Sequence, residues 1–286
     1  MTNKISSLVN LASPKLGSFG VRANDEFFAP LSRMLSDSEP VFIPDKYDDH
    51  GKWMDGWETK RRRTPGNDWC LIKLGCLGVI KKIEVNTKFF TGNYPPEVSI
   101  EGIQSEIEPD ENDKNWISIL EKINIDGDKI NEFNTEKTNV VNWVRLKIFP
   151  DGGIARLRLW GDVYKNWEEE NKNQLLELSA LKNCGKIISY NNAHYGDVTA
   201  LLSDGRGKNM GDGWETRRRR EPGNDWIIIG LGKSGHLDKI EVDTAFFKGN
   251  FPESCSLDAT NIIEEIKNTK LINWEPITPK TLLKAD

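Results

Sequence analysis

The sequence DGWETKRRRTPGNDW at residues 55–69 returns almost unchanged as DGWETRRRREPGNDW at residues 212–226. Thirteen of the 15 positions are identical, at a separation of 157 residues. The same separation holds downstream, where IEVNTKFFTGNYP at 83–95 and IEVDTAFFKGNFP at 240–252 share nine of 13 positions. A repeat of this length is far above the 20–50 residues of solenoid units, so the sequence predicts a duplicated domain.

The repeat extends upstream and has a visible boundary. Asn24 in the segment NDEFF is aligned with Asn192 in NAHYG. The polar run KNWEEENKNQ at 165–174 follows the first repeat and has the composition of an exposed linker. The sequence therefore predicts a first repeat at 1–164, a linker at 165–174 and a second repeat at 175–286.

Short stretches with alternating apolar and polar residues recur within the repeats, which is the pattern of β-strands. In the first repeat they are WCLIKL (69–74), KKIEV (81–85), VRLKIF (144–149) and IARLRLW (154–160). Segments rich in glycine, proline, asparagine and aspartate separate them, as turns require. Short helices are expected only at 31–37 and 175–181. The pattern predicts an all-β fold built as an antiparallel sandwich or jelly roll.

Composition places the chain among globular proteins and excludes several classes. Of the 286 residues, 29% are charged and 37% are hydrophobic, which is typical of a soluble protein able to bury two cores. No stretch has the length of a membrane span or the apolar core of a signal peptide, so we expect a cytoplasmic protein without a membrane partner. The net charge of -5 argues against nucleic-acid binding. The 4 cysteines lack a C-x2-C spacing and are expected to be free thiols, mostly buried.

The motif D-G-W-E-T-[KR]-R, followed by a D-W pair and by T-x-F-F-x-G-N-x-P, resembles the signature of the allantoicase family. PDGGIARLRLWG at 150–161 is similar to the segment that closes each repeat in that family, and His194 lies where the family's second repeat has a histidine. The resemblance extends from about Leu16 to Trp274. It implies two tandem jelly-roll β-sandwich domains of the galactose-binding-like type, homo-oligomeric assembly, and hydrolysis of allantoate to ureidoglycolate and urea in purine (allantoin) degradation.

Two features qualify what the resemblance implies. By the repeat spacing, the second repeat should continue for about 30 to 40 residues beyond Asp286 to its own P-D-G-G-x-x-R-x-R segment. We therefore expect a second sandwich that lacks its final strands, with unpaired edges and an open core. Some family members depend on manganese, whereas this sequence shows no clustered His, Asp or Glu pattern that demands a metal, and no other cofactor is evident.

The substrate implied by the resemblance sets the chemistry that its site needs. Allantoate carries a carboxylate and two ureido groups, so the site needs a cation, acceptors for N–H groups, and an acid and a base. Glu58 and Glu215 are the leading acid–base candidates, and Arg61 and Arg218, three residues later, are the candidates for the carboxylate. Residues three apart on a strand face opposite sides, so each pair meets only if the chain turns. The alternative is an ion pair that ties a loop to the sheet.

Asp68, Asp225 and His194 are further candidates for proton transfer. Each aspartate precedes a tryptophan at the start of an apolar strand, where it either binds ligand or caps the turn. His194 is suited to general-base catalysis near neutral pH, and the alternative is a structural histidine. The first repeat has no equivalent histidine, which would suit a site that uses the two repeats differently.

Four more residues are candidates for binding the substrate. Arg156 and Arg158 alternate with leucines, so both point to one face of their strand, which is either a solvated exterior or an anion-binding surface. Asn93 and Asn250, in G-N-x-P, either contact a ureido group or form the turn before proline.

The remaining motif residues receive structural interpretations. Asp55 and Asp212 precede glycine and are expected to form turns. Alternation places Arg61 and Arg63 on one face of an extended segment and Lys60 and Arg62 on the other. Ordinary exposed charge is expected for Lys60, Arg62, Arg217 and Arg219, and core positions are expected for Trp57, Trp69, Trp214 and Trp226.

Two other functions compete with the enzyme. This jelly-roll type also occurs in non-enzymatic ligand-binding modules, which display exposed aromatic residues for sugar stacking. A truncated and inactive allantoicase is the other possibility.

Overall fold

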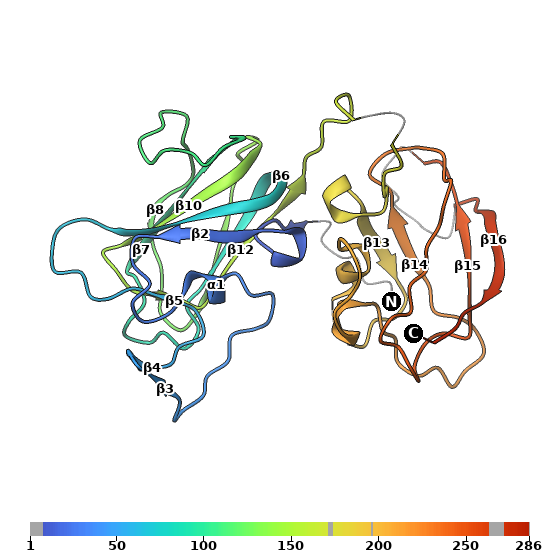
Figure 1. Ribbon diagram of the computed structural model, residues 1–286, viewed down its shortest axis with the longest axis horizontal. Coiled ribbons are helices and arrows are strands. Elements are labelled where there is room, and N and C mark those ends of the chain that lie inside the picture. The colour runs from blue at the N-terminus through green and yellow to red at the C-terminus, as the bar shows by residue number, and fades with distance from the viewer. Residues whose placement is uncertain (1–7, 171–173, 196, 263–271, 286) are drawn as a thin grey trace.

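The structure, a computed structural model, describes residues 8–170, 174–195, 197–262 and 272–285 (Figure 1). The first repeat contains β1 (Val9–Asn10), η1 (Pro14–Leu16), β2 (Phe19–Ala23), α1 (Leu31–Met34), β3 (Tyr47–Asp48), β4 (Gly51–Lys52), β5 (Trp57–Glu58), β6 (Asp68–Asn86), β7 (Glu97–Ile103), β8 (Ile117–Asn124), β9 (Ile130–Asn134), β10 (Val141–Phe149), β11 (Gly153–Ile154) and β12 (Arg156–Val163). The second contains η2 (Leu181–Asn183), β13 (Lys186–Tyr190), η3 (Val198–Leu202), η4 (Met210–Asp212), β14 (Ile227–Gly230), β15 (Ser254–Ala259) and β16 (Glu275–Leu282). The predicted all-β fold is confirmed.

Strand β6 connects the two layers of the first sandwich. Its first half pairs with β2 and β10, and its second half pairs with β9 and β12. One layer is therefore β2-β6-β10-β7-β8 and the other is β9-β6-β12-β1. The sequence predicted two separate strands at 69–74 and 81–85, and this was wrong because β6 continues through both for 19 residues. Between its two halves β6 passes close to the backbone of Leu16. Only glycine fits at position 75, because a Cβ there would lie 1.8 Å from the carbonyl oxygen of Leu16.

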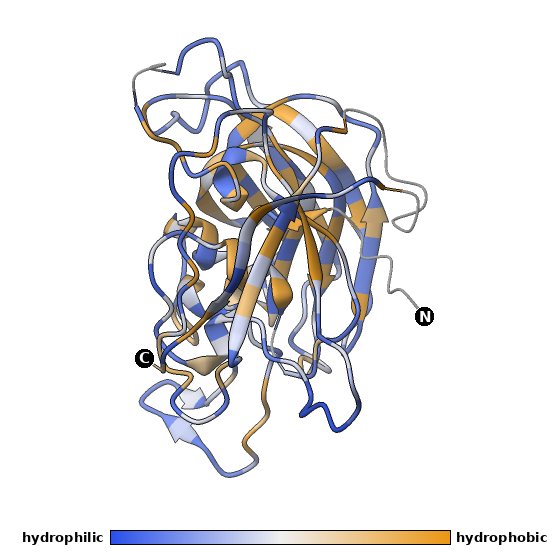
Figure 2. Ribbon diagram, turned by 90° about the vertical axis from the view of Figure 1, so that its right-hand side faces the viewer, coloured by the Kyte–Doolittle hydropathy of each residue, from blue (hydrophilic) through white to orange (hydrophobic). Residues whose placement is uncertain are grey.

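The core of the first repeat lies between these layers. Ile72 and Leu146 contribute from one layer, and Ile83 and Leu157 contribute from the other, all of them at 1% exposure or less. Apolar and polar residues alternate along the strands, as the coloured bands in Figure 2 show. This alternation is the physical reason why these segments form strands, since one face of each must be buried.

One of the two expected helices is present. The helix expected at 31–37 is α1, which is four residues long. Residues 175–180 are not helical, and Leu181 is the first residue of the 3-10 helix η2; backbone carbonyls in this segment accept hydrogen bonds from outside it. The amide of Gly232 donates to the Leu178 oxygen at 2.9 Å, and the Asn183 side chain donates to the Glu177 oxygen at 2.8 Å.

The second repeat reproduces the start of the first in the same register. Strands β13 and β14 correspond to β2 and the start of β6. Tyr190 of β13 is opposite Ile227 of β14, and in the first repeat Ala23 of β2 is opposite Cys70 of β6. Strand β14 is only four residues long, however, and residues 231–243 form no strand. Strands β15 and β16 form a separate pair (Figure 1).

The two repeats contact each other through a small apolar cluster. Leu16, Val9 and Cys76 of the first repeat pack with Leu181 and Ile187 of the second. All 4 cysteines are free, but the expectation that most are buried was wrong, because only Cys70 is buried. Among the described residues, no helix has the length and apolar character needed to cross a bilayer.

Candidate functional site

A cavity of about 470 Å³ lies in the first repeat beside β5. The residues that line it are Phe28, Phe42, Lys52, Met54, Glu58, Phe89, Thr91, Asn93 and Asp128. Two of the candidates from the sequence, Glu58 and Asn93, therefore line the same pocket, which is open to solvent on one side. The lining is mainly apolar, and it also has the carboxyls of Glu58 and Asp128, a hydroxyl, an amide and an amine, which is the usual character of a small-molecule site.

Backbone pairing on both sides fixes Glu58. Its backbone exchanges hydrogen bonds with Ala29 on one side, at 3.2 Å, and Gly153 of β11 lies opposite it on the other. The side chain is buried, and its Oε1 accepts a hydrogen bond of 2.7 Å from Nδ2 of Asn93. Burial raises the pKa of Glu58, the Asn93 hydrogen bond opposes this, and the negative charge of Asp48 adds to the rise. The raised pKa favours the protonated form of this carboxyl relative to that of a solvent-exposed glutamate.

The turn that carries Asn93 is strained at one residue. Phe89 has φ 71°, in the left-handed region that a bulky side chain avoids, and its amide donates to Oδ1 of Asp128 at 2.8 Å. Phe246, at the equivalent place in the second repeat, has φ 69°. Such strain persists only where the surroundings impose it, and it gathers at binding sites. The Asn93 carbonyl accepts from the amide of Gly153 at 2.7 Å, so the backbone of the turn is held while the side chain reaches Glu58.

Lys52 is a cavity residue that the sequence analysis missed. It lies on the β3–β4 hairpin, and its Nζ is 4.4 Å from the centre of the Phe42 ring. It is the only cation among the residues that line this cavity. One feature of the sequence could have pointed to Lys52. The turn-forming residues at 48–51 predict a hairpin, and a hairpin there returns the chain toward the repeated motif that contains Glu58.

The second repeat contains the same carboxyl–amide pair. Nδ2 of Asn250 donates to Oε1 of Glu215 at 2.7 Å, the distance found between Asn93 and Glu58. The amide of His194 donates to the Glu215 carbonyl at 2.8 Å, as the amide of Phe28 does to the Glu58 carbonyl at 3.2 Å. His194 thus takes the place of a cavity-lining phenylalanine. Its side chain is exposed and its ring stacks edge-on against Tyr195.

The alignment of Asn24 with Asn192 was wrong by one residue. The amide of Trp69 donates to Oδ1 of Asn24 at 2.7 Å, and the amide of Trp226 donates to Oδ1 of Asn191 at 2.8 Å. Asn191 is therefore the counterpart of Asn24. The error arose because the segment before each motif differs in length between the repeats, which short identities do not reveal.

Comparison with known proteins agrees with this duplicated arrangement. The allantoicase repeat model matches residues 9–164 and 176–286. The chain belongs to the allantoicase family. It is 48% identical over 255 residues to "Probable allantoicase 1" of Burkholderia mallei, covering 89% of this chain and 75% of that protein. It is 45% identical over 288 residues to "Probable allantoicase" of Acinetobacter baylyi, covering 100% of this chain and 84% of that protein.

Solved allantoicase structures have the same fold. A crystal structure of allantoicase from Saccharomyces cerevisiae has a TM-score of 0.83 and 34% identity, covering 98% of this chain and 82% of that chain. A second structure of allantoicase gives a TM-score of 0.83 with the same identity. The tandem jelly-roll architecture implied by the sequence resemblance is confirmed.

The allantoicase motif also contains a buried carboxylate network that does not line the cavity. Asp68 accepts hydrogen bonds of 2.8 Å from both Arg62 and Asn24. In the second repeat, Asp225 accepts from Arg219 at 2.8 Å and from Asn191 at 3.2 Å. Burial alone would raise the pKa of Asp225, but hydrogen bonds, foremost that of Arg219, hold it below its usual value. Of the two roles left open for the aspartates, the contacts favour the structural cap.

Arg62 and Arg219 were expected to be ordinary exposed charges, and this was wrong. Both are half-buried, because a buried carboxylate requires a cation beside it. The exposed positions belong instead to Arg61 and Arg218. Among the described residues neither arginine forms an ion pair with its glutamate, so the alternative of a Glu–Arg pair that ties a loop to the sheet is not found there. Lys60 is exposed, as predicted, and its Nζ forms an ion pair of 3.3 Å with Asp25.

Arg156 and Arg158 share a face of β12, as predicted, but that face is not a solvated exterior. Arg156 is 1% exposed and donates to Oδ2 of Asp55 at 2.7 Å and to backbone carbonyls, including that of Ser38 at 2.7 Å. Arg158 donates to the Asp37 carbonyl at 3.1 Å. The two arginines therefore bind the backbone of the loop at residues 36–38, which lies against β12. Asp55 therefore anchors an arginine, in addition to preceding the turn at Gly56.

The four tryptophans of the motifs are not all core residues. Trp57 is fully buried, and its Nε1 donates to the Asp25 carbonyl at 2.9 Å. Trp69, Trp214 and Trp226 are only half-buried, so the expectation was wrong for these three. Trp69 packs in a second cluster with Leu71 and Trp143, outside the main core, and the Arg22 guanidinium lies 4.9 Å from its ring centre.

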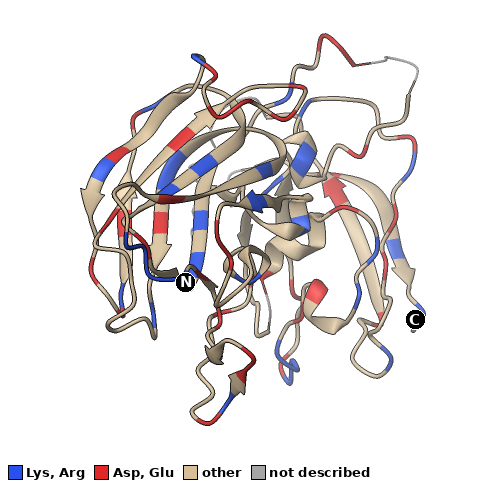
Figure 3. Ribbon diagram, turned by 60° about the vertical axis from the view of Figure 1, so that its left-hand side comes forward, with Lys and Arg blue, Asp and Glu red and all other residues tan. Residues whose placement is uncertain are grey.

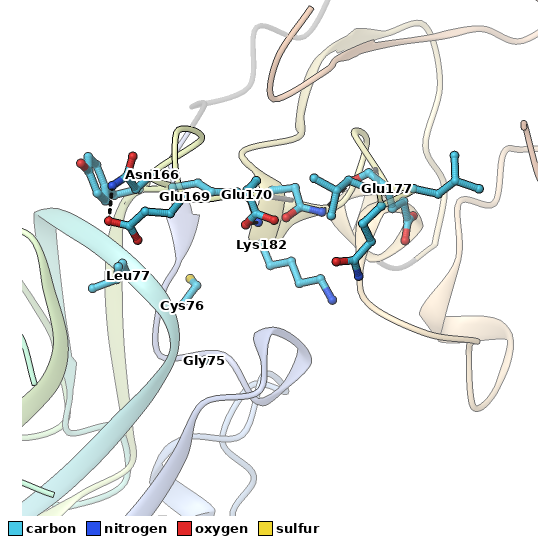
Figure 4. A pocket seen from close by; sticks show the side chains of 14 residues that line it. Gly75, Cys76, Leu77, Asn166, Glu169, Glu170, Glu177 and Lys182 are labelled. Carbon is cyan, nitrogen blue, oxygen red and sulfur yellow. Dashed lines mark hydrogen bonds and ion pairs between the residues drawn. The ribbon is translucent and has the colours of Figure 1, made fainter. Parts of the chain in front are cut away.

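A second cavity of about 490 Å³ lies beside the segment that joins the repeats (Figure 4). Cys76, Glu177 and Lys182 are among its lining residues, and Asn166 is hydrogen-bonded to Glu169 at 2.6 Å. None of the candidates from the sequence lines it. Charges of both signs are interspersed over the strands and loops of both repeats (Figure 3).

The donor set does not fit a metal ion. Within the part of the chain that the structure describes, no three His, Cys, Asp or Glu side chains converge into a group that could hold one. The described residues therefore do not form a site that fits the manganese of some family members.

Proposed function

We propose that this chain is an allantoicase that hydrolyses allantoate to ureidoglycolate and urea in the cavity of the first repeat. The observation that carries the proposal is the buried Glu58 carboxyl, with its raised pKa, hydrogen-bonded to Asn93 in a cavity that also contains Lys52. Membership of the allantoicase family supports the substrate. A non-enzymatic binding module is not favoured, because the allantoicase repeat model matches both repeats and the solved structures that cover 98% of the chain are allantoicases.

Each group has a role that its chemistry supports. Lys52 binds the substrate carboxylate as a point charge. The Nδ2 group of Asn93 is occupied by Glu58, which leaves its amide oxygen to accept from a ureido N–H group. The rings of Phe28, Phe42 and Phe89 supply the apolar part of the lining.

Glu58 acts first as the acid and then as the base. Its proton passes to the ureido nitrogen as the bond between that nitrogen and the central carbon breaks, and urea leaves. The lone pair of the remaining ureido nitrogen stabilises the carbon from which urea has departed. A water oxygen then bonds to this carbon, and the water proton returns to Glu58. The products are urea and ureidoglycolate, and Glu58 is protonated again.

The second repeat has a related role in this proposal. Glu215, Asn250 and His194 repeat the arrangement with an imidazole in place of a phenyl ring, so they form a second candidate site with its own base. A role for Arg61 or Arg218 in binding the carboxylate is the competing assignment. Homo-oligomeric assembly and a cytoplasmic location remain predictions from the sequence.

Urea release from allantoate tests the assignment. Glu58→Gln preserves the size of the side chain and an acceptor for Asn93, and should lower kcat by about 10²–10⁴-fold. Lys52→Ala should mainly raise KM, whereas Arg61→Ala, which alters an exposed neighbour, should leave both constants unchanged. The geometry-based assignment is refuted if Arg61→Ala raises KM and Lys52→Ala does not, or if Glu58→Gln turns over at the wild-type rate.

A further inference from the structure

Asp128 is the second carboxyl that lines the cavity beside β5, and it has no part in the proton transfers assigned to Glu58. It lies on the turn between β8 and β9 with φ 52°, in the left-handed region that aspartate adopts more readily than most residues. Its Oδ1 accepts a hydrogen bond of 2.8 Å from the amide of Phe89. Among the described residues, nothing donates a hydrogen bond to its Oδ2. The residue is exposed, so Oδ2 is accessible to a ligand that enters the cavity.

The turn that carries Asp128 is held against the turn that carries Asn93. The hydroxyl of Thr87 donates to the Asp126 carbonyl at 2.6 Å, and the amide of Asp128 donates to the Phe90 carbonyl at 3.2 Å. Two connections that lie far apart in the sequence are therefore bonded to each other beside the cavity. Together they place an amide and a carboxylate in fixed positions on its lining.

The acceptors of this lining match the donors of a ureido group. Each ureido group ends in an NH2 group, and a carboxylate oxygen without a partner is a strong acceptor for such a donor. In the proposed function, Lys52 binds the carboxylate of the ligand and the amide oxygen of Asn93 accepts from one N–H group. A ligand with two ureido groups needs a further acceptor. Asp128 is the carboxylate of the lining that is left for this purpose.

We propose that Asp128 is a specificity-determining residue, which binds the terminal NH2 of a ureido group through Oδ2 while its Oδ1 holds the turn at Phe89. This choice of ligand class rests on the proposed function. Replacement of the NH2 by a methyl group removes the donor with little change in the size of the ligand, and it leaves Oδ2 facing an apolar group. The cavity should therefore prefer ureido acids to their acetamido analogues.

Titration calorimetry with N-carbamoylglycine and N-acetylglycine tests this proposal, because the two acids differ only in an NH2 or a methyl group. Wild type should bind N-carbamoylglycine about tenfold more tightly, which is the effect of one hydrogen bond to a charged acceptor. Asp128→Asn keeps an oxygen for the Phe89 amide but presents an amide NH2 to the ligand. The preference should therefore be lost while Tm is unchanged. A purely structural role would instead lower Tm and weaken both acids alike.

Asp126→Asn is the matched control. It makes the same change in the same turn, in a side chain that binds Lys129 at 2.8 Å and does not line the cavity, so the preference should be kept. Equal affinity of wild type for the two acids, no measurable binding of either, or a preference that persists in Asp128→Asn would overturn the proposal.

Urea release from allantoate, measured on the same proteins, separates this result from the proposed function. Wild type that prefers N-carbamoylglycine but releases no urea would support the role of Asp128 and refute the hydrolase. Wild type that releases urea but has no preference between the two acids would refute the role of Asp128 alone.

Discussion

The duplicated aspartates Asp55 and Asp212 allow one ion pair to be tested in two environments within the same chain. In the first repeat, Arg156 and Asp55 have side chains that are 1% and 13% exposed, and the Arg156 guanidinium makes four hydrogen bonds. Asp55→Asn keeps an acceptor oxygen but leaves the arginine charge buried without a counter-charge. Removing one partner of a buried pair costs about 3–5 kcal/mol, and the retained acceptor places Asp55→Asn at about 3 kcal/mol.

The same change in the second repeat should have a small effect. The Lys15 and Asp212 side chains are 35% and 22% exposed, and such a pair contributes at most about 1 kcal/mol. Guanidinium denaturation combined with hydrogen exchange of β12 and β13 amides reports on the two repeats separately. Equal losses below about 1 kcal/mol for Asp55→Asn and Asp212→Asn would refute the argument that burial makes the first pair strong.

Three further measurements test the local arguments. Burial raises the pKa of Glu58 above its ordinary 4.5, so ionisation of Glu58 destabilises the folded wild type. The unfolding free energy of Glu58→Gln should therefore rise relative to that of wild type as the pH increases from below 4.5 through the raised pKa. A difference that does not change with pH would contradict this. Gly75→Ala meets a carbonyl oxygen at 1.8 Å and should cost about 1–3 kcal/mol of unfolding free energy, whereas Gly92→Ala, with nothing within 4 Å, should change it by about 0.5 kcal/mol or less. Arg62→Ala leaves its buried aspartate partner without a cation and should lower Tm by several degrees, while the exposed Arg61→Ala should not change Tm measurably.

The fold and the cavity glutamate could be predicted from the sequence because both are local signals. Alternation shows directly which segments bury one face, and the 157-residue repeat shows that the domain is duplicated. Glu58 and Asn93 each stood within a repeated motif, so they were candidates before any contact between them was known. Their hydrogen bond could not be foreseen, because 35 residues separate them and only the fold brings them together.

The arginine run shows where sequence reasoning ends. Alternation separated Lys60 and Arg62 from Arg61 and Arg63, and the structure shows this division, with the first pair bonded to aspartates and the second pair exposed. Exposed charge was expected for both Lys60 and Arg62, and this is confirmed for Lys60, which is 66% exposed, but wrong for Arg62, which is half-buried beside Asp68. Alternation is symmetric between the two faces, and the choice depends on Asp68 and other residues that long-range folding supplies.

Lys52 was missed for a different reason. It lies outside the motif that the two repeats share, and a lysine on a short hairpin is usually an exposed charge. Its relevance comes from the hairpin, which places it on the rim of the cavity that contains Glu58. Identity between repeats identifies the residues that both copies need for folding or for a common site, and it omits groups that only one copy possesses.

The two copies of the carboxyl–amide pair show that the motif alone does not raise the pKa of its glutamate. Glu58 and Glu215 each accept the same 2.7 Å hydrogen bond from an asparagine. Glu58 is buried at 8% exposure because β11 pairs along it, whereas Glu215 is only half-buried and no described strand of the second repeat pairs in the place of β11. Burial is the main cause of the raised pKa of Glu58, so the proton-donating form depends on that covering strand.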